Sequence, residues 1–463
     1  MWDYLDSNKK VGLIDIPLTY PPQKINGHMV SGMPVPSENS IFTYPPEFHT
    51  ELIREIGDYM IDNKLGIMTK DNPVDALKHL YAYTEMRMDA VRYMMKSKGP
   101  FDFFMVVFRG TDFVQHAAFK YLDEDYMEKH PEETAKFGKT IYQFYEKIDS
   151  YLSEIIQLMG DDCTLVLMSD HGLGPLKKLF YINRWLKQEG FLVLKKYRML
   201  RKTGLKWRSK SIASILQRSG LAFINIFLPN FLKKLRLFYF LPYEKHPSCV
   251  IDWGKTKAYA NLTWTDGVIK VNLKGRERNG SVDKSNYDMV CDRLVEKLKN
   301  IKDPDSGKNV MEAVYRRGEI YSGACVKDAP DVIALTRDIN YAYRVTVSGD
   351  ALFETPANPV PATHRMNGIF MIKGPDIKKG ISLSVNNIVD VAPTILYLMG
   401  CRIPEDMDGK VVVDAIDEDL LKSNPVVFYK DDDGSGDSKG DVEFTDQDRM
   451  KIEESLRSLG YLT

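Results

Sequence analysis

The sequence predicts an α/β fold, and two patterns carry that prediction. Residues 101–108 and 164–168 are short, nearly continuous apolar runs, as expected of parallel strands that are covered on both faces. A segment with helical spacing, 132–159, separates them, and polar residues follow each run. Strand, helix and strand with polar groups at the carboxyl ends are typical of α/β proteins. The composition, 44% hydrophobic and 27% charged, excludes fibrous and wholly disordered proteins.

The other elements of the N-terminal half follow from periodicity and turn residues. Pro17 and the Tyr-Pro-Pro turn at 20–22 end the first strand. The helical pattern begins at Trp2, so the chain looks as if it starts within a helix. In order, we expect a helix at 2–8, a strand at 11–16, helices at 47–62 and 73–97, a strand at 101–108, a helix at 132–159 and a strand at 164–168.

The second half reads as a small insertion followed by a return of the core pattern. The insertion combines short strands with one amphipathic helix, and the later strands are again apolar. Residues 431–440 are an acidic, Gly/Ser-rich linker by composition. In order, we expect strands at 256–262 and 267–273, a helix at 284–299, strands at 310–316, 330–335 and 368–373, and helices at 388–399 and 446–459.

A length of 463 residues suits either about three domains or one large α/β domain that carries insertions. We expect a first part of the core at 1–190, a basic amphipathic insertion at 191–250, an α+β cap at 251–325, a second part of the core at 326–422, and the acidic linker with the C-terminal helix at 423–463.

The cysteines and the apolar windows predict a cytoplasmic protein. The five cysteines form no C-x-x-C pair and no disulfide framework, as expected in a reducing compartment. No window of 18 uncharged apolar residues predicts a membrane span, because Pro229 and basic residues interrupt the best candidate, 223–240. No signal peptide is visible at the N-terminus.

The formal net charge of −1 hides a strong asymmetry along the chain. Residues 190–243 hold 12 Lys or Arg and no Asp or Glu, and the remaining residues carry 51 basic and 64 acidic side chains. Three interpretations of the stretch 195–240 stay open: a solvated helical face, peripheral contact with an anionic membrane, and binding of an anionic substrate. Nucleic acid is not expected as a partner, because no known binding motif accompanies the charge.

Asp112 and His116 follow the apolar run at 101–108 as T-D-x-x-Q-H. A spacing of four residues places a carboxylate and an imidazole on one face of a helix, as a divalent metal requires. The alternative is a helix cap beside a surface histidine.

Asp170 and His171 end the second apolar run, and His364 precedes a third. A sharp turn at Gly172 would let the first two side chains converge, although plain turn chemistry also explains the pair. Ligands of open parallel sheets collect at the carboxyl ends of strands. Two Asp and three His at such ends are the mixed oxygen and nitrogen donors that Zn²⁺ or Mn²⁺ prefers.

These motifs resemble the alkaline phosphatase superfamily, and within it the type I phosphodiesterase/nucleotide pyrophosphatase branch and its predicted microbial phosphodiesterase or phosphomutase relatives. The residues that carry the resemblance are S-D-H-G at 169–172, T-D-x-x-Q-H at 111–116 and H-R-x-x-G-I-F at 364–370. Supporting segments are 13–22, 183–186, 252–258, 272–276 and 390–396.

The resemblance implies a three-layer α/β/α sandwich with a mostly parallel sheet, a small α+β cap and two divalent metal ions, usually Zn²⁺ with Mn²⁺ as an alternative. By motif match, Asp112, His116 and His364 would hold one ion, while Asp170 and His171 would supply part of the other site. The implied activity is two-metal, in-line hydrolysis of a phosphodiester or pyrophosphate bond. The substrate would be a small or lipid-linked phosphate ester.

Family members carry an additional metal-binding Asp and a Thr or Ser nucleophile upstream of the segment that matches residues 2–8. We therefore expect the nucleophile upstream of Met1, no catalytic nucleophile within this sequence, and impaired activity of an N-terminally truncated chain. Thr111 and Ser169 are poor substitutes, because the first precedes a predicted ligand and the second belongs to a strand. The alternatives are a phosphomutase of the same superfamily and an inactive binding or scaffold protein.

Overall fold

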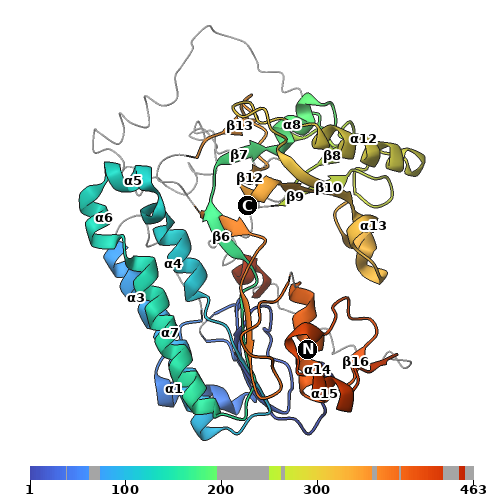
Figure 1. Cartoon of the computed structure of the whole chain (residues 1–463). Helices are drawn as coiled ribbons and strands as arrows, with labels where there is room; N and C mark the ends of the chain where they lie inside the picture. Colours follow the sequence, from blue (N-terminus) through green and yellow to red (C-terminus); the bar gives the residue numbers. More distant parts are fainter. Residues whose placement is uncertain are drawn as a thin grey trace, which may run out of the picture. The chain divides into compact units, whose positions relative to one another are not determined.

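The computed structural model describes residues 1–37, 39–61, 73–195, 250–261, 266–356, 362–384, 387–430 and 448–453. The chain forms two compact units. Unit 1 comprises the ranges 1–178, 338–342 and 355–463, and unit 2 comprises 179–337 and 343–354. Each unit contains both helices and strands (Figure 1), so the predicted α/β class is confirmed.

Unit 1 is built on a four-stranded sheet in the order β3-β2-β1-β4. Strand β1 pairs in parallel with both β2 and β4, with Gly12 opposite Phe104 on one side and His28 on the other. The strand predicted at 11–16 is therefore confirmed. The strands of this sheet are β1 (Val11–Ile16), β2 (Gly27–Ser31), β3 (Thr43–Tyr44) and β4 (Phe103–Val106).

Strand β1 is buried along its whole length because alternate side chains enter two different cores. Ile14 packs into the core formed mainly by helices, together with Phe48 and Phe144. Leu13 points to the opposite face and packs with Met29 and the partly buried Trp2.

The helices of unit 1 depart from the sequence expectation at two points. The segment predicted as one helix is two, because α6 ends at Phe137 and α7 begins at Thr140. Only a 3₁₀ turn, Trp2–Tyr4, forms at the N-terminus. Helices α3 and α7 run side by side (Figure 1). The helices are α1 (Glu47–Ile56), α3 (Pro73–Ser97), α4 (Gly110–Ala118), α5 (Glu124–Lys129), α6 (Pro131–Phe137), α7 (Thr140–Met159), α14 (Val391–Leu398) and α15 (Glu418–Ser423), with 3₁₀ turns at Phe119–Leu122, Ile388–Asp390 and Val413–Ala415.

The other ladders of unit 1 have two strands each, and two of them are antiparallel. A mostly parallel sheet and a three-layer sandwich are therefore not confirmed. Every residue of β4 and β5 is only half-buried, so full burial of the two apolar runs is not confirmed. Strand β4 nevertheless packs on both faces as expected, with Phe104 against the helical core and Phe103 against the core on the other side. Among the described strands, β4 pairs only with β1 and β5 only with β15, so neighbours cover each on one edge. These strands are β5 (Leu165–Met168), β6 (Gly172–Pro175), β14 (Ala362–Arg365), β15 (Phe370–Lys373), β16 (Ile403–Pro404) and β17 (Phe428–Tyr429).

Unit 2 is organised around a sheet in the order β10-β11-β9-β8. Helix α12 packs on it through Leu294 and Leu298, both fully buried. The strand expected to open the second part of the core, β11, pairs instead with β9 and β10. The elements are α8 (Ile182–Gln188), β8 (Ala258–Tyr259), β9 (Asp266–Val271), α12 (Tyr287–Lys299), β10 (Met311–Arg316), α13 (Arg317–Ile320), β11 (Val332–Thr336) and β13 (Phe353–Glu354), with 3₁₀ turns at Lys284–Asn286, Ala324–Asp328 and Arg337–Ile339. A further sheet has the order β12-β7-β13, with β7 at Lys178–Tyr181 and β12 at Tyr341–Arg344.

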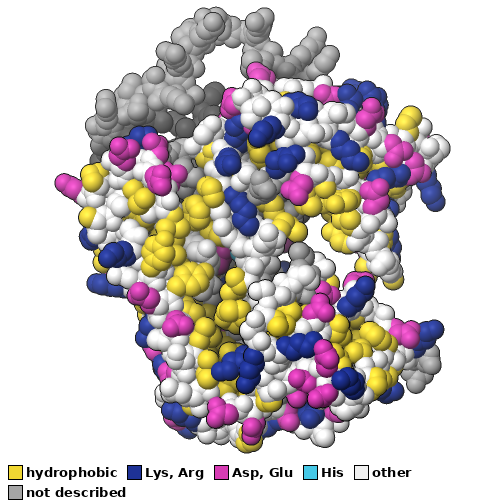
Figure 2. All heavy atoms as spheres, in the orientation of Figure 1, with side chains coloured by type: hydrophobic (Ala, Val, Ile, Leu, Met, Phe, Trp, Pro, Cys, Tyr) yellow, Lys and Arg dark blue, Asp and Glu magenta, His cyan; other side chains and the backbone are white. Residues whose placement is uncertain are grey.

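Several sequence predictions fall outside the described residues. They include the basic stretch 195–240 apart from Lys195, the linker at 431–440, and most of the helix expected at 446–459, of which residues 448–453 are helical. Within the described part of the chain, no helix combines the length and the apolar character needed to cross a membrane. On the face shown in Figure 2, acidic and basic side chains of the described residues are interspersed.

Candidate functional site

Helix α4 presents the first pair of predicted ligands. It begins four residues after β4 ends, with Asp112 in its first turn and His116 one turn later. Gly110 opens the helix where it passes very close to its neighbours. A Cβ at this position would lie 2.4 Å from Thr84 Oγ1 and 2.7 Å from Phe144 Cζ. The glycine therefore lets α4 seat closely against α3 and α7.

The third predicted ligand reaches the same place from a distant part of the chain. Strand β14 pairs antiparallel with β6, which puts His364 opposite Leu173. Because β6 begins directly after His171, this register stacks the rings of His171 and His364 with centroids 3.8 Å apart and planes 17° apart. Gly172 is needed at this crossing, since a Cβ there would lie 2.2 Å from the carbonyl oxygen of Asn367.

Three donor atoms form a compact triangle. Asp112 Oδ1 lies 3.3 Å from His116 Nε2 and 3.6 Å from His364 Nε2, and the two imidazole nitrogens lie 3.2 Å apart. Asp112 Oδ1 is buried, and none of the described residues makes a hydrogen bond of good geometry to it. The structure thus brings together Asp112, His116 and His364, although His116 and His364 lie 248 residues apart in the sequence.

The electrostatics of the triangle favour the protonation states of metal ligands. Burial alone would raise the pKa of Asp112, but the hydrogen bond from His116 and the nearby imidazoles of His364 and His171, when protonated, outweigh it and lower the pKa overall. Burial, together with the neighbouring His171, lowers the pKa of His364 to about 4. At neutral pH the first side chain is therefore a carboxylate and the second a neutral imidazole.

Asp170 and His171 lie beside the triangle rather than within it. His171 Nδ1 is 3.0 Å from the carbonyl oxygen of Gly172, so a proton on Nδ1 would leave Nε2 as an acceptor. Nε2 lies 3.6 Å from Asp170 Oδ2, and the Asp170 side chain is 77% exposed. This pair therefore presents an imidazole nitrogen and an open carboxylate next to the first three donors.

The two hydroxyls that adjoin the predicted ligands in sequence are both engaged with the backbone. Thr111 Oγ1 donates to the carbonyl oxygen of Phe108 at 3.0 Å. Ser169 Oγ accepts from the amide of Ile369 at 2.8 Å.

Sequence reasoning missed a buried polar network behind α4. Asp15, at the end of β1, accepts hydrogen bonds from Arg87 and Tyr83 of α3 and from Arg109, which precedes α4. The signal in the sequence was a single carboxylate within the apolar run V-G-L-I-D-I. Nothing in the spacing of Arg87 or Arg109 identified its partners.

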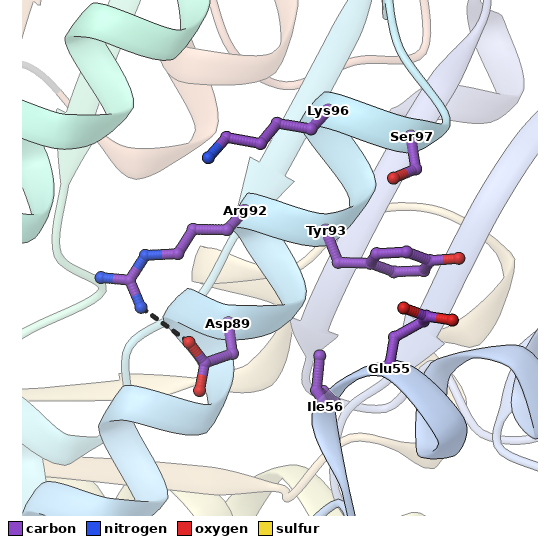
Figure 3. Close-up of a pocket in the computed structure, with 7 residues that line it drawn as sticks. All are labelled: Glu55, Ile56, Asp89, Arg92, Tyr93, Lys96 and Ser97. Atoms are coloured by element: carbon purple, nitrogen blue, oxygen red, sulfur yellow. Dashed lines mark hydrogen bonds and ion pairs between the residues drawn. The ribbon is translucent and has the colours of Figure 1, made fainter.

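A surface pocket of about 420 Å³ lies between α1 and α3. Figure 3 shows Arg92 hydrogen-bonded to Asp89, with Lys96 one turn further along the helix. Arg92 also pairs with Glu85 and Glu154, so its charge is neutralised within the protein. None of the predicted ligands lines this pocket, and the triangle is the stronger candidate for a functional site.

The comparison with protein families agrees with the motifs at this site. A model of the type I phosphodiesterase / nucleotide pyrophosphatase family matches residues 23–355, a span that contains Asp112, His116, Asp170 and His171 but ends before His364. No curated protein matched the chain. The predicted resemblance is therefore confirmed, and the chain belongs to the type I phosphodiesterase / nucleotide pyrophosphatase family of the alkaline phosphatase superfamily.

Proposed function

We propose that the chain is a metal-dependent hydrolase of phosphodiester or pyrophosphate bonds, with one divalent cation held by Asp112, His116 and His364. The donor triangle carries this proposal. In a tetrahedral site with ligand bonds of about 2.0–2.2 Å, the ligand atoms lie about 3.3–3.6 Å from one another. The sides of the triangle, 3.2, 3.3 and 3.6 Å, have that size.

The residues at this position also fit a cation chemically. A buried carboxylate oxygen without a good hydrogen-bond donor is costly, and a cation between the three donors would compensate it. Two imidazoles and one carboxylate form a donor set that suits Zn²⁺, and Mn²⁺ accepts the same ligands. Zn²⁺ is therefore the metal we propose, with Mn²⁺ as the alternative.

Asp170 and His171 would supply part of a second cation site. The stacking of His171 on His364 keeps its ring next to the first three donors, and the exposed Asp170 carboxylate faces solvent, where a substrate would enter. When bound, two divalent ions neutralise the phosphoryl oxygens and stabilise the attacking and leaving oxygens of an in-line displacement. The residues of the chain orient those ions, and we assign the nucleophile to neither Thr111 nor Ser169.

Metal stoichiometry tests the ligand assignment. The unchanged chain, dialysed against Zn²⁺ and analysed by elemental mass spectrometry, should retain bound zinc. Asp112→Asn, His116→Ala and His364→Ala should each lower its zinc content. His130→Ala is the matched control, because His130 is exposed and stacks on Tyr126, away from the triangle. Zinc content that is unchanged in all three ligand variants would refute the assignment.

Substrate preference tests the reaction class. A chromogenic phosphodiester should be cleaved faster than the corresponding phosphomonoester if the diesterase assignment is right. Release of the chromophore from neither compound, with zinc still bound, would instead favour an inactive binding homologue. Interconversion of sugar phosphates would favour the phosphomutase.

Two further proposals concern location and the basic stretch. We propose a cytoplasmic protein in which residues 195–240 contact an anionic membrane or a lipid-linked phosphate ester, because that stretch combines cations with aromatic residues. Co-sedimentation with vesicles should then increase with the content of anionic lipid and decrease with salt. Binding that ignores both variables would refute the membrane contact.

A further inference from the structure

The buried network behind α4 holds the beginning of the helix that carries Asp112 and His116. We propose that Arg109 is a positioning residue: its guanidinium, anchored on Asp15, fixes the first turn of α4 and so sets where Asp112 stands relative to His364. The inference rests on the proposed function, because it concerns the affinity of the same site for a metal ion.

The Arg109 side chain donates hydrogen bonds to three separate parts of unit 1, at Asp15, Tyr83 and Ile61. Its Nε and Nη2 atoms each donate to an oxygen of Asp15 at 3.4 Å. Nη2 also lies 2.6 Å from the hydroxyl of Tyr83 and 3.3 Å from the carbonyl oxygen of Ile61. The side chain is only 10% exposed, so water competes little for these contacts.

The backbone of the same residue holds the first turn of α4. Arg109 is the N-cap of the helix, and its carbonyl oxygen accepts from the amides of Asp112 at 3.1 Å and Phe113 at 3.3 Å. The guanidinium therefore ties α4 to the scaffold, while the carbonyl ties Asp112 to Arg109. A displacement of Arg109 would be transmitted directly to the carboxylate at the site.

The anchor itself is strained. Asp15 has a φ of +58°, in the left-handed region that non-glycine residues rarely adopt, and the pairing of β1 with β2 shifts register between Ile14 and Ile16. Such a conformation persists only where the surroundings hold it, and it is concentrated at functional sites. Here it accompanies a 1% exposed carboxylate that meets Arg87 and Arg109.

Geometry distinguishes this role from that of a general positive charge. Arg109 reaches both oxygens of Asp15 from two nitrogens, which the planar fork of arginine permits and the single ammonium of lysine does not. Asp15 would remain paired without Arg109, because Arg87 Nε donates to it at 3.0 Å and the Tyr83 hydroxyl at 3.2 Å. A variant at position 109 should therefore fold.

Unit 2 contains a matched control of the same construction. Asp331 accepts from Arg276 at 2.6 and 2.8 Å and from Tyr287 at 2.6 Å, and a second guanidinium, that of Arg317, lies 3.5 Å away. Arg317 thus corresponds to Arg109 in a buried carboxylate cluster that carries none of the predicted ligands. Its replacement should leave metal binding unchanged.

The test compares Arg109→Met, Arg109→Lys and Arg317→Met with the unchanged chain. Zn²⁺ affinity is measured by competition with a chromogenic chelator, and the Co²⁺-loaded proteins are compared by visible absorption, which reports the ligand geometry. Circular dichroism establishes that each variant is folded. Both Arg109 variants should bind Zn²⁺ about tenfold more weakly or worse, as seen when groups that orient metal ligands are lost, with an altered Co²⁺ spectrum. Arg317→Met should match the unchanged chain.

The outcomes distinguish the role of Arg109, a general loss of stability and the metal site itself. Arg109 variants with unchanged Zn²⁺ affinity and Co²⁺ spectrum would overturn the positioning role. Full rescue by Arg109→Lys would also overturn it, because charge rather than fork geometry would then suffice. Equal weakening in Arg317→Met would identify a general stability effect and refute the inference. If the unchanged chain binds neither ion, the proposed metal site fails, which is distinguishable from failure of the role of Arg109.

Discussion

Replacing Asp15 by Asn should strongly destabilise unit 1, and the reason lies in its partner Arg87. Asn tolerates the left-handed conformation better than most residues and keeps one oxygen acceptor for Arg87 and Tyr83, so the change removes the charge and the acceptor that faces Arg109. Arg87 is 1% exposed, and Asp15 is its carboxylate partner among the described residues. Removing one member of a buried ion pair leaves an uncompensated charge and costs about 3–5 kcal/mol.

Hydrogen exchange measures this loss within unit 1. Protection of amides in β1 and α3 should fall by about two to three and a half orders of magnitude, because each factor of ten corresponds to about 1.4 kcal/mol. Amides of α12 in unit 2 should keep their protection and serve as the internal control. Asp331→Asn is the matched variant, and it should cost less because its guanidiniums are 27% and 23% exposed and water compensates them.

Two results would refute this reasoning. One is a loss of less than about 1 kcal/mol in Asp15→Asn, which would mean that the buried charge of Arg87 is solvated or paired in another way. The other concerns the double variant Asp15→Asn/Arg87→Met, which removes the uncompensated charge and should regain part of the lost stability. A double variant that is less stable than Asp15→Asn would show that packing, not charge, is lost.

Two further predictions concern polar side chains, Glu85 and Asn183, that are remote from the site. Burial raises the pKa of Glu85, but hydrogen bonds from Tyr151, Arg92 and Lys147 outweigh it and lower the pKa to about 2, from 4.5. The Glu85 carboxylate therefore stabilises the folded state fully above pH 4.5, and this contribution is lost as the pH falls toward 2. The stability of Glu85→Gln should accordingly depend less on pH between 4.5 and 2. An unchanged dependence on pH would contradict this. Asn183, fully buried, exchanges three hydrogen bonds of 2.8–2.9 Å with the backbone of residues 260 and 345. Asn183→Ala should cost about 3 kcal/mol in urea unfolding, with exposed Asn300→Ala near zero as control; equal losses would refute the reasoning.

The parts of the fold that depend on local pattern were predictable from the sequence. The strand at 11–16 and the helix at 73–97 have the bounds that periodicity predicts. The residues of β4 and β5 were found, but their half-burial was not. A continuous apolar run indicates a strand without indicating how many neighbours the strand has, since the neighbours come from distant parts of the chain.

Local pattern identifies the candidate ligands, whereas the residues that support them are linked only by long-range contacts. Asp112 and His116 could be found because helical spacing is local, and His364 because the family motif marks it. Asp15 lies 72 residues from Arg87 and 94 from Arg109, and no periodicity links them. An arginine on an amphipathic helix looks like a solvated charge until the fold buries it.

The contacts of Arg109 show why the residues that hold α4 in place lie far from it in the sequence. His364 reaches the triangle on a strand of its own, so spacing along α4 can fix His116 relative to Asp112 but cannot fix either relative to His364. The distance from the donors on α4 to His364 depends on how α4 packs on the rest of unit 1. At the start of α4, Arg109 contacts Asp15 and Tyr83, and Gly110 leaves the room that a Cβ would take from Thr84 and Phe144. A metal site tolerates displacements of only about 0.5 Å, so under the positioning role that we propose for Arg109 these contacts would set the affinity although none of their atoms would touch the ion.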